Sequence, residues 1–261
     1  MSGVADHNQA LQHLAQQLRR LEKTSREARC KGGLFSTGIP ALDRLLPEQG
    51  ISPGTLVEWL SRGDGCGAGT LVFAVAAHLT QGNGACVIID RNRSFYPPPL
   101  LLPSHQKLSA SDLDRTIVVH PPDKRDTLWA LEQSLRCCGV AVVICRLGHL
   151  NDHAYRRLQL AAETGGGIGL LLRPGEHRSQ PSWADIRLWV EALPFDARFE
   201  RKPSSETDAL TLGRLLRIEL IHCRGRAGGE AVELEIDDET GDVRLAPRLA
   251  VAKDSIRAAG A

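Results

Sequence analysis

The hydrophobic pattern divides the chain into an N-terminal stretch with helical spacing and a longer stretch in which strands and helices alternate. Residues 5–29 contain neither Gly nor Pro, and leucines recur there at intervals of three, four and three residues. This spacing predicts a helix of about six or seven turns with one narrow apolar stripe. We take the stripe leucines as candidate partner contacts: Leu11, Leu14, Leu18 and Leu21. The stripe could equally cover the chain's own core, and the pattern leaves both readings open.

From residue 35 onward, short and nearly all-apolar segments alternate with amphipathic ones. Strands are expected at 55–60, 85–90, 116–120, 140–145 and 167–172, and helices at 41–46, 70–80, 126–138 and 152–163. Apolar strands separated by helices indicate a parallel sheet that is covered on both faces. After Pro174 the helical segments stop, and further strands are expected at 186–192, 214–222, 230–236 and 243–245.

The predicted fold class is therefore α/β, with a mainly parallel sheet between helices and antiparallel strands added at the C-terminal side. An N-terminal helix precedes this core. We expect three regions: the helix and its linker at 1–33, the core at 34–250 and a tail at 251–261.

Composition narrows the function classes. Lys and Arg number 32 against 31 Asp and Glu, so the net charge of +1 offers no bulk attraction for nucleic acid. Seven cysteines show no CxxC or His/Cys ligand spacing, which predicts a reduced chain without a metal site. No apolar run approaches the roughly 18 residues of a membrane span, and no signal-peptide core is seen. We expect a cytoplasmic protein, with nucleoid association as an alternative.

A glycine-rich loop lies between an expected strand and an expected helix, where a phosphate-binding loop belongs. A working loop reads GxxxxGK[ST], because its backbone N–H groups wrap phosphates, its Lys neutralises them and its hydroxyl holds Mg²⁺. The loop here consists of Gly63, Asp64, Gly65, Cys66, Gly67, Ala68, Gly69 and Thr70. Gly69 replaces the lysine and Ala68 replaces a glycine, so we expect a degenerate loop. It serves either as a plain strand-to-helix turn or as a weak site for ATP or another anion.

Two further groups needed for phosphoryl transfer are also replaced. At the end of the strand expected at 140–145, Cys145 stands in place of the acid that would hold Mg²⁺. Asn92 stands in place of the base that would polarise the attacking water. An amide cannot accept that proton. With lysine, acid and base all missing, we expect no ATPase activity, no catalytic residue and no required cofactor.

Several stretches resemble known proteins. Residues 35–43, followed by Gly50, Gly54 and Glu58, resemble the opening of the RecA recombinase core, and later strands continue the likeness in the same order. A closer resemblance is to the ImuA family, the short RecA-like accessory proteins of the bacterial translesion mutasome. It rests on residues 156–163, 171–174, 230–241 and 244–249.

This resemblance implies a RecA-like core and a role in the SOS response, in damage-induced mutagenesis and translesion DNA repair. It implies an ImuB-type Y-family polymerase homologue and an error-prone C-family polymerase as partners, with RecA and weakly bound single-stranded DNA as further candidates. The alternatives left open are a RecA-filament antagonist, a SulA-like division inhibitor and a DNA-dependent ATPase or recombinase.

In RecA, the segment after the strand expected at 167–172 is a long DNA-binding loop. The corresponding segment here is short, and its cationic residues are the candidate DNA contacts: Arg173, His177 and Arg178. Such a segment can contact phosphates but cannot form a long stacking platform. It could equally be an ordinary surface loop.

Overall fold

One mixed sheet organises the part of the chain that the computed structural model describes. Those residues are 33–63, 65–81, 84–95, 115–194, 213–224, 228–237 and 242–246. The sheet has nine strands in the order β3-β2-β4-β5-β1-β6-β7-β8-β9. Their bounds are β1 Leu56–Ser61, β2 Ala85–Ile89, β3 Thr116–Val119, β4 Val140–Arg146, β5 Ile168–Pro174, β6 Ile186–Leu193, β7 Gly213–Cys223, β8 Ala231–Asp237 and β9 Val243–Leu245.

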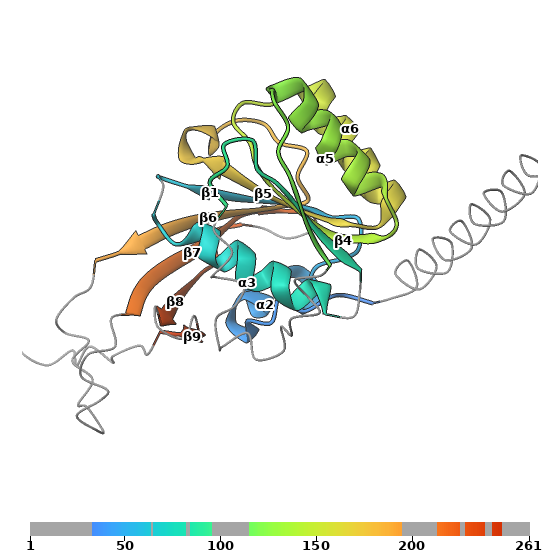
Figure 1. Cartoon of the computed structure of the whole chain (residues 1–261). Helices are drawn as coiled ribbons and strands as arrows, with labels where there is room; N and C mark the ends of the chain where they lie inside the picture. The colour runs from blue at the N-terminus through green and yellow to red at the C-terminus, as the bar shows by residue number, and fades with distance from the viewer. Residues whose placement is uncertain are drawn as a thin grey trace, which may run out of the picture.

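Helices cover both faces of the parallel half of the sheet (Figure 1). The α-helices are α2 Pro40–Leu45, α3 Ala68–Thr80, α5 Lys124–Arg136 and α6 Asp152–Gly165, and short 3-10 turns span Pro47–Gln49 and Gly175–His177. Helices α2 and α3 lie on one face, while α5 and α6 lie side by side on the other. Asp123 and Asn151 cap α5 and α6 by accepting hydrogen bonds from backbone N–H groups three residues on.

Each face has its own hydrophobic core, because alternate residues of a strand point to opposite sides. The core beneath α3 includes Trp59 and Leu71, both fully buried. The core beneath α5 and α6 includes Leu56, Leu131 and Cys145. Strand β1 lies near the middle of the sheet, parallel to both β5 and β6, so its residues are covered on both sides.

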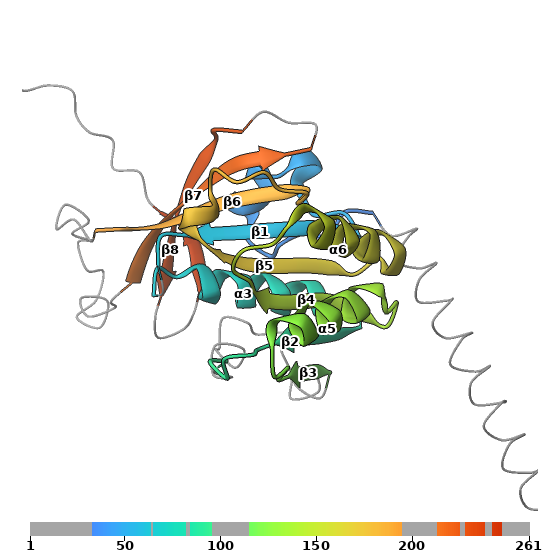
Figure 2. The same ribbon diagram turned by 90° about the horizontal axis from the view of Figure 1, so that it is seen from above.

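The antiparallel half begins where β7 pairs with β6, and β8 and β9 extend it (Figure 2). The predicted fold class is confirmed: a mainly parallel sheet lies between helices, and antiparallel strands follow at its C-terminal side. The ends of the elements differ from the predicted ends by one or two residues. The predicted N-terminal helix lies outside the described residues.

Candidate functional site

The degenerate loop joins β1 to α3 at the carboxyl end of the sheet's central strand. Gly65 and Gly67 have φ values of +80° and +87°, in the left-handed region that favours glycine. Gly67 is the N-cap of α3, and a Cβ there would lie 2.7 Å from a methyl carbon of Leu216 on β7. Asp64 lies outside the described residues. The turn from β1 into α3 therefore depends on glycine at positions 65 and 67.

A pocket of about 290 Å³ lies beside this loop. Its lining residues come from the loop and from the ends of β4 and β5, and they include the cations Arg62, Arg146 and Arg173. The N-terminus of α3 adds the partial positive charge of a helix end. Chemically, this arrangement can attract an anion, but a γ-phosphate would meet no lysine from the loop itself.

Gly69 and Thr70 lie in the first turn of α3. A Cβ built on Gly69 has no atom within 4 Å, so the absence of a lysine is not forced by lack of space. The Thr70 hydroxyl lies 3.4 Å from a guanidinium nitrogen of Arg214 on β7. A hydroxyl shared with a cation is a poor partner for Mg²⁺, because the two positive charges would compete for the same oxygen.

Cys145, which replaces the magnesium-binding acid, is fully buried near the end of β4. It packs into the core beneath α5 and α6, on the sheet face opposite α3. Burial, aided by the negative charge of Asp90, raises the pKa of its thiol to about 12. The thiol therefore stays neutral in this environment and packs as a small apolar group.

Asp90 follows β2 and holds the turn that carries Asn92. Its carboxylate accepts hydrogen bonds from the Phe95 amide at 2.7 Å and the Ser94 hydroxyl at 3.2 Å. Burial alone would raise the pKa of Asp90, but these hydrogen bonds outweigh it and the pKa lies below its ordinary value. Asn92 is exposed on this turn. The Asp90 carboxylate, whose charge acts on Cys145, is therefore engaged in holding the backbone of this turn.

A buried ion cluster links the three central strands just beneath the pocket. Glu58 on β1 is fully buried and pairs with Arg173 of β5 and, at 2.6 Å, with Arg187 of β6. The register explains this, because Arg187 lies directly opposite Glu58 and Arg173 lies two residues beyond its other neighbour, Leu171. Burial would raise the pKa of Glu58, but the Tyr155 hydroxyl and the two arginines together lower it.

The structure places the candidate DNA contacts differently from the sequence prediction. Arg173 is only 3% exposed, and its guanidinium also donates to the Gly148 carbonyl. His177 is buried in the 3-10 turn after β5. Arg178 is half-buried, pairs with Glu219 at 3.0 Å and stacks over the Trp189 ring. Arg173 and His177 are thus buried, and the guanidinium of Arg173 is paired with Glu58, while the assignment of Arg173, His177 and Arg178 as DNA contacts stays a prediction.

Sequence reasoning missed the Glu58 cluster, although a signal for it exists. Glu58 stands in an otherwise apolar strand that is expected to be buried on both faces. A carboxylate in such a strand requires buried cationic partners. That rule would have pointed to Arg173 and Arg187, the arginines of neighbouring strands, as interior rather than surface residues.

Other predicted features fall partly or wholly outside this site. The stripe residues Leu11, Leu14, Leu18 and Leu21 lie outside the described residues. Among the residues that the structure covers, no group of three or more His, Cys, Asp or Glu side chains is arranged to hold a metal ion. No helix in those same ranges is long and apolar enough to cross a membrane.

Comparison with known proteins identifies the family. No family model matches the chain. Protein ImuA of Caulobacter vibrioides strain NA1000 / CB15N is 31% identical over 212 residues, which cover 75% of this chain and 81% of the relative. Protein ImuA of strain ATCC 19089 / CIP 103742 / CB 15 matches with the same values. With this identity over most of both chains, the protein belongs to the ImuA family.

Proposed function

We propose that this chain is a non-catalytic accessory protein of damage-induced translesion DNA synthesis. The observation that carries the proposal is family membership together with a loop that keeps its turn but lacks phosphoryl-transfer groups. Gly69 stands where a working loop has its lysine, although a Cβ there would meet no atom within 4 Å, and Cys145 is a buried thiol whose pKa is raised to about 12. The strand order, with β1 between β5 and β6, supports the RecA-like core that the resemblance implies.

In this proposal the chain is a scaffold, and its partners are an ImuB-type Y-family polymerase homologue and an error-prone C-family polymerase. RecA is a further proposed partner. Single-stranded DNA would be bound weakly, because a net charge of +1 provides little phosphate attraction. The proposed partners follow from the family resemblance. Arg173 and His177 are buried in the structure, so these two side chains do not form an exposed basic patch for tight DNA binding.

The experiment is to recover the tagged full-length chain from cells after DNA damage and to identify the proteins that co-purify with it. Both polymerase subunits should be recovered, and they should remain after nuclease treatment because the contacts are between proteins. A Thr70→Ala variant should recover the same partners, since the loop is not used for hydrolysis. Recovery of RecA alone would instead favour a filament antagonist, and recovery of a division protein would favour a SulA-like inhibitor.

A further inference from the structure

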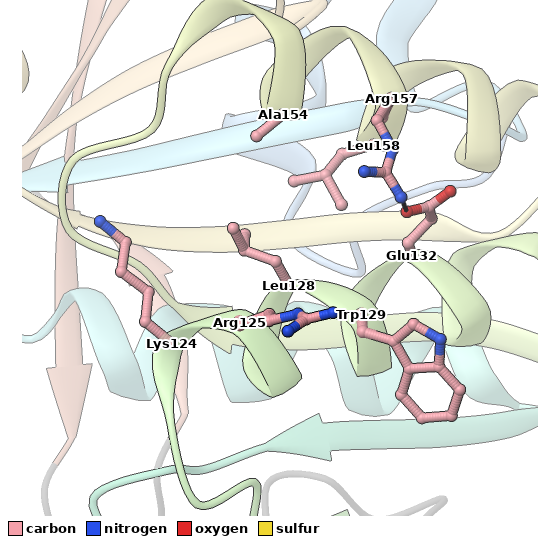
Figure 3. A pocket seen from close by; sticks show the side chains of 8 residues that line it. All are labelled: Lys124, Arg125, Leu128, Trp129, Glu132, Ala154, Arg157 and Leu158. Carbon is pink, nitrogen blue, oxygen red and sulfur yellow. Dashed lines mark hydrogen bonds and ion pairs between the residues drawn. The ribbon is translucent and has the colours of Figure 1, made fainter.

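A pocket away from the loop region lies between α5 and α6 (Figure 3). Its volume of about 550 Å³ is within the range of specific binding pockets, about 300–1,000 Å³. We call it the α5–α6 groove. Its lining residues are Lys124, Arg125, Leu128, Trp129, Glu132, Ala154, Arg157 and Leu158. None of them belongs to the degenerate loop or to the Glu58 cluster.

The floor and one side of the groove are apolar. Leu128, Ala154 and Leu158 lie between the two helices, and Trp129, 62% exposed, stands at the edge of the groove with its indole extending from α5 away from Ala154 and Leu158 (Figure 3). A tryptophan is costly to leave in water, and exposed aromatic side chains beside an apolar floor are typical of protein-binding hot spots. The groove can therefore bury apolar side chains of a partner.

The rim of the groove is cationic. Lys124, Arg125 and Arg157 surround it, and Glu132 is the one carboxylate among its lining residues. Glu132 is already neutralised, because it is buried and paired with Arg157 and, at 2.8 Å, with Arg136. Within the described part of the chain, neither Lys124 nor Arg125 has an ion-pair partner. The groove therefore offers uncompensated positive charge.

The groove lies near the N-terminal ends of both helices. Its lining residues begin at Lys124 in the first turn of α5 and at Ala154 in the first turn of α6, and they reach Glu132 beyond the middle of α5. Each N-terminus carries a partial positive charge. The acidic residues of these first turns, Asp126 and Asp152, are not among the lining residues. Because the Asp123 carboxylate already caps α5, the attraction for negative groups of a partner comes mainly from the side chains of Lys124 and Arg125.

We infer that the α5–α6 groove binds a short acidic, amphipathic segment of a partner protein. Its apolar side chains would pack on Leu128, Leu158 and Trp129, and its carboxylates would meet Lys124 and Arg125. A protein segment fits better than nucleic acid, because a phosphate backbone could use Lys124 and Arg125 but not the apolar floor, and Trp129 is the one aromatic residue among the lining residues for base stacking. This inference does not depend on the proposed role in translesion synthesis.

The test begins with a phage-displayed library of random 16-residue peptides selected on the purified full-length chain. Peptides retained by a Trp129→Ala variant are removed by counter-selection. The selected peptides should combine Asp or Glu with Leu, Ile or Phe at helical spacing. Selection of basic peptides, or of none that depend on Trp129, would overturn the inference.

The consensus peptide is then labelled with fluorescein and its affinity measured by anisotropy. We expect Trp129→Ala to weaken binding about tenfold or more and Arg125→Glu about fivefold or more. Trp183→Ala is the matched control, because Trp183 is also exposed, at 44%, but does not line the groove. It should bind like the unaltered chain.

Three further results would contradict the proposal. One is equal affinity for a peptide in which every acid is replaced by Lys. Another is displacement of the peptide by a single-stranded oligonucleotide at physiological salt, which would make this surface a nucleic-acid site. The third is self-association of the chain that Trp129→Ala abolishes, which would make a second copy the occupant.

Discussion

At the scale of single residues, Glu58 determines the chemistry of the sheet's centre. Its carboxylate is the common partner of Arg173 and Arg187, which come from the two strands flanking β1. A buried ion pair contributes modestly compared with apolar packing, but removing one member leaves uncompensated charge. The same carboxylate also fixes the arginine that lines the pocket beside the loop, so the pocket's shape depends on it.

We therefore expect Glu58→Gln to lower the free energy of unfolding by about 3 kcal/mol or more. The physical reason is that two buried guanidinium groups would face a neutral amide. Urea denaturation of the purified chain measures the change. Glu176→Gln is the control, because that side chain is 76% exposed and its replacement should cost less than about 0.5 kcal/mol. Equal midpoints for the two variants would show that the cluster is unimportant for stability.

The cluster also predicts a pH dependence. The pKa of Glu58 is lower in the folded chain than in the unfolded chain, because the Tyr155 hydroxyl and the arginines outweigh burial. Its contribution to stability is complete above the unfolded-state pKa and is lost as pH falls through the folded-state pKa. The unaltered chain should lose stability below about pH 5. Glu58→Gln should show a smaller loss over the same range, measured by urea midpoints at several pH values.

At the scale of elements, hydrophobic periodicity predicted most of what the structure shows. The continuous apolar runs of β4 and β5 signalled strands buried on both faces, and the amphipathic pattern of α6 signalled a helix on the surface of the sheet. Side-chain pairing across strands was not predictable in the same way, because it depends on register. Arg173 was expected in a surface loop, yet it belongs to β5 and faces Glu58.

The α5–α6 groove shows a second limit of sequence reasoning. Trp129 belongs to α5, in which Leu131 and Leu135 are buried in the core. The helical spacing of these leucines predicts that Trp129 lies outside the buried face. Whether such a residue meets a neighbouring helix depends on how α5 and α6 pack, which the pattern does not specify. The groove therefore emerges only from the three-dimensional arrangement.

The N-terminal helix remains a prediction at this scale. We expect Leu14→Glu combined with Leu18→Glu to weaken association with itself or with a partner strongly, because each buried leucine contributes about 1.5–3 kcal/mol. Light scattering and partner pull-down measure the effect. Gln12→Glu with Gln16→Glu adds the same charge off the stripe and should leave association unchanged. If the leucine variant keeps its mass and partner binding but melts at lower temperature, the helix belongs to the chain's own core.

At the scale of the whole molecule, we expect that the chain does not hydrolyse ATP. Purified chain should show no ATP turnover, with or without single-stranded DNA. Gly69→Lys should not restore ATP turnover, although a Cβ at this position meets no atom within 4 Å, because Cys145 and Asn92 still stand where an acid and a base are needed. DNA-stimulated turnover that disappears in Thr70→Ala would contradict the expectation and favour a DNA-dependent ATPase.

The sheet and its two helical layers thus combine three regions with different roles. The glycine-rich loop follows β1, the Glu58 cluster joins β1, β5 and β6, and the α5–α6 groove lies on the face opposite α3. This separation suits a scaffold, because a partner can dock on the helices while the loop is left unchanged.

The proposed non-catalytic role is tested most directly by the frequency of damage-induced mutation in a strain that lacks the gene for this chain. The unaltered chain and a Gly69→Asp, Thr70→Ala double variant are each supplied at equal abundance. A non-catalytic accessory protein predicts that both restore mutagenesis to the same level and that an empty vector does not. If the double variant is folded and abundant but behaves like the empty vector, the loop performs chemistry or binds an essential nucleotide. The chain would then not be a non-catalytic accessory protein.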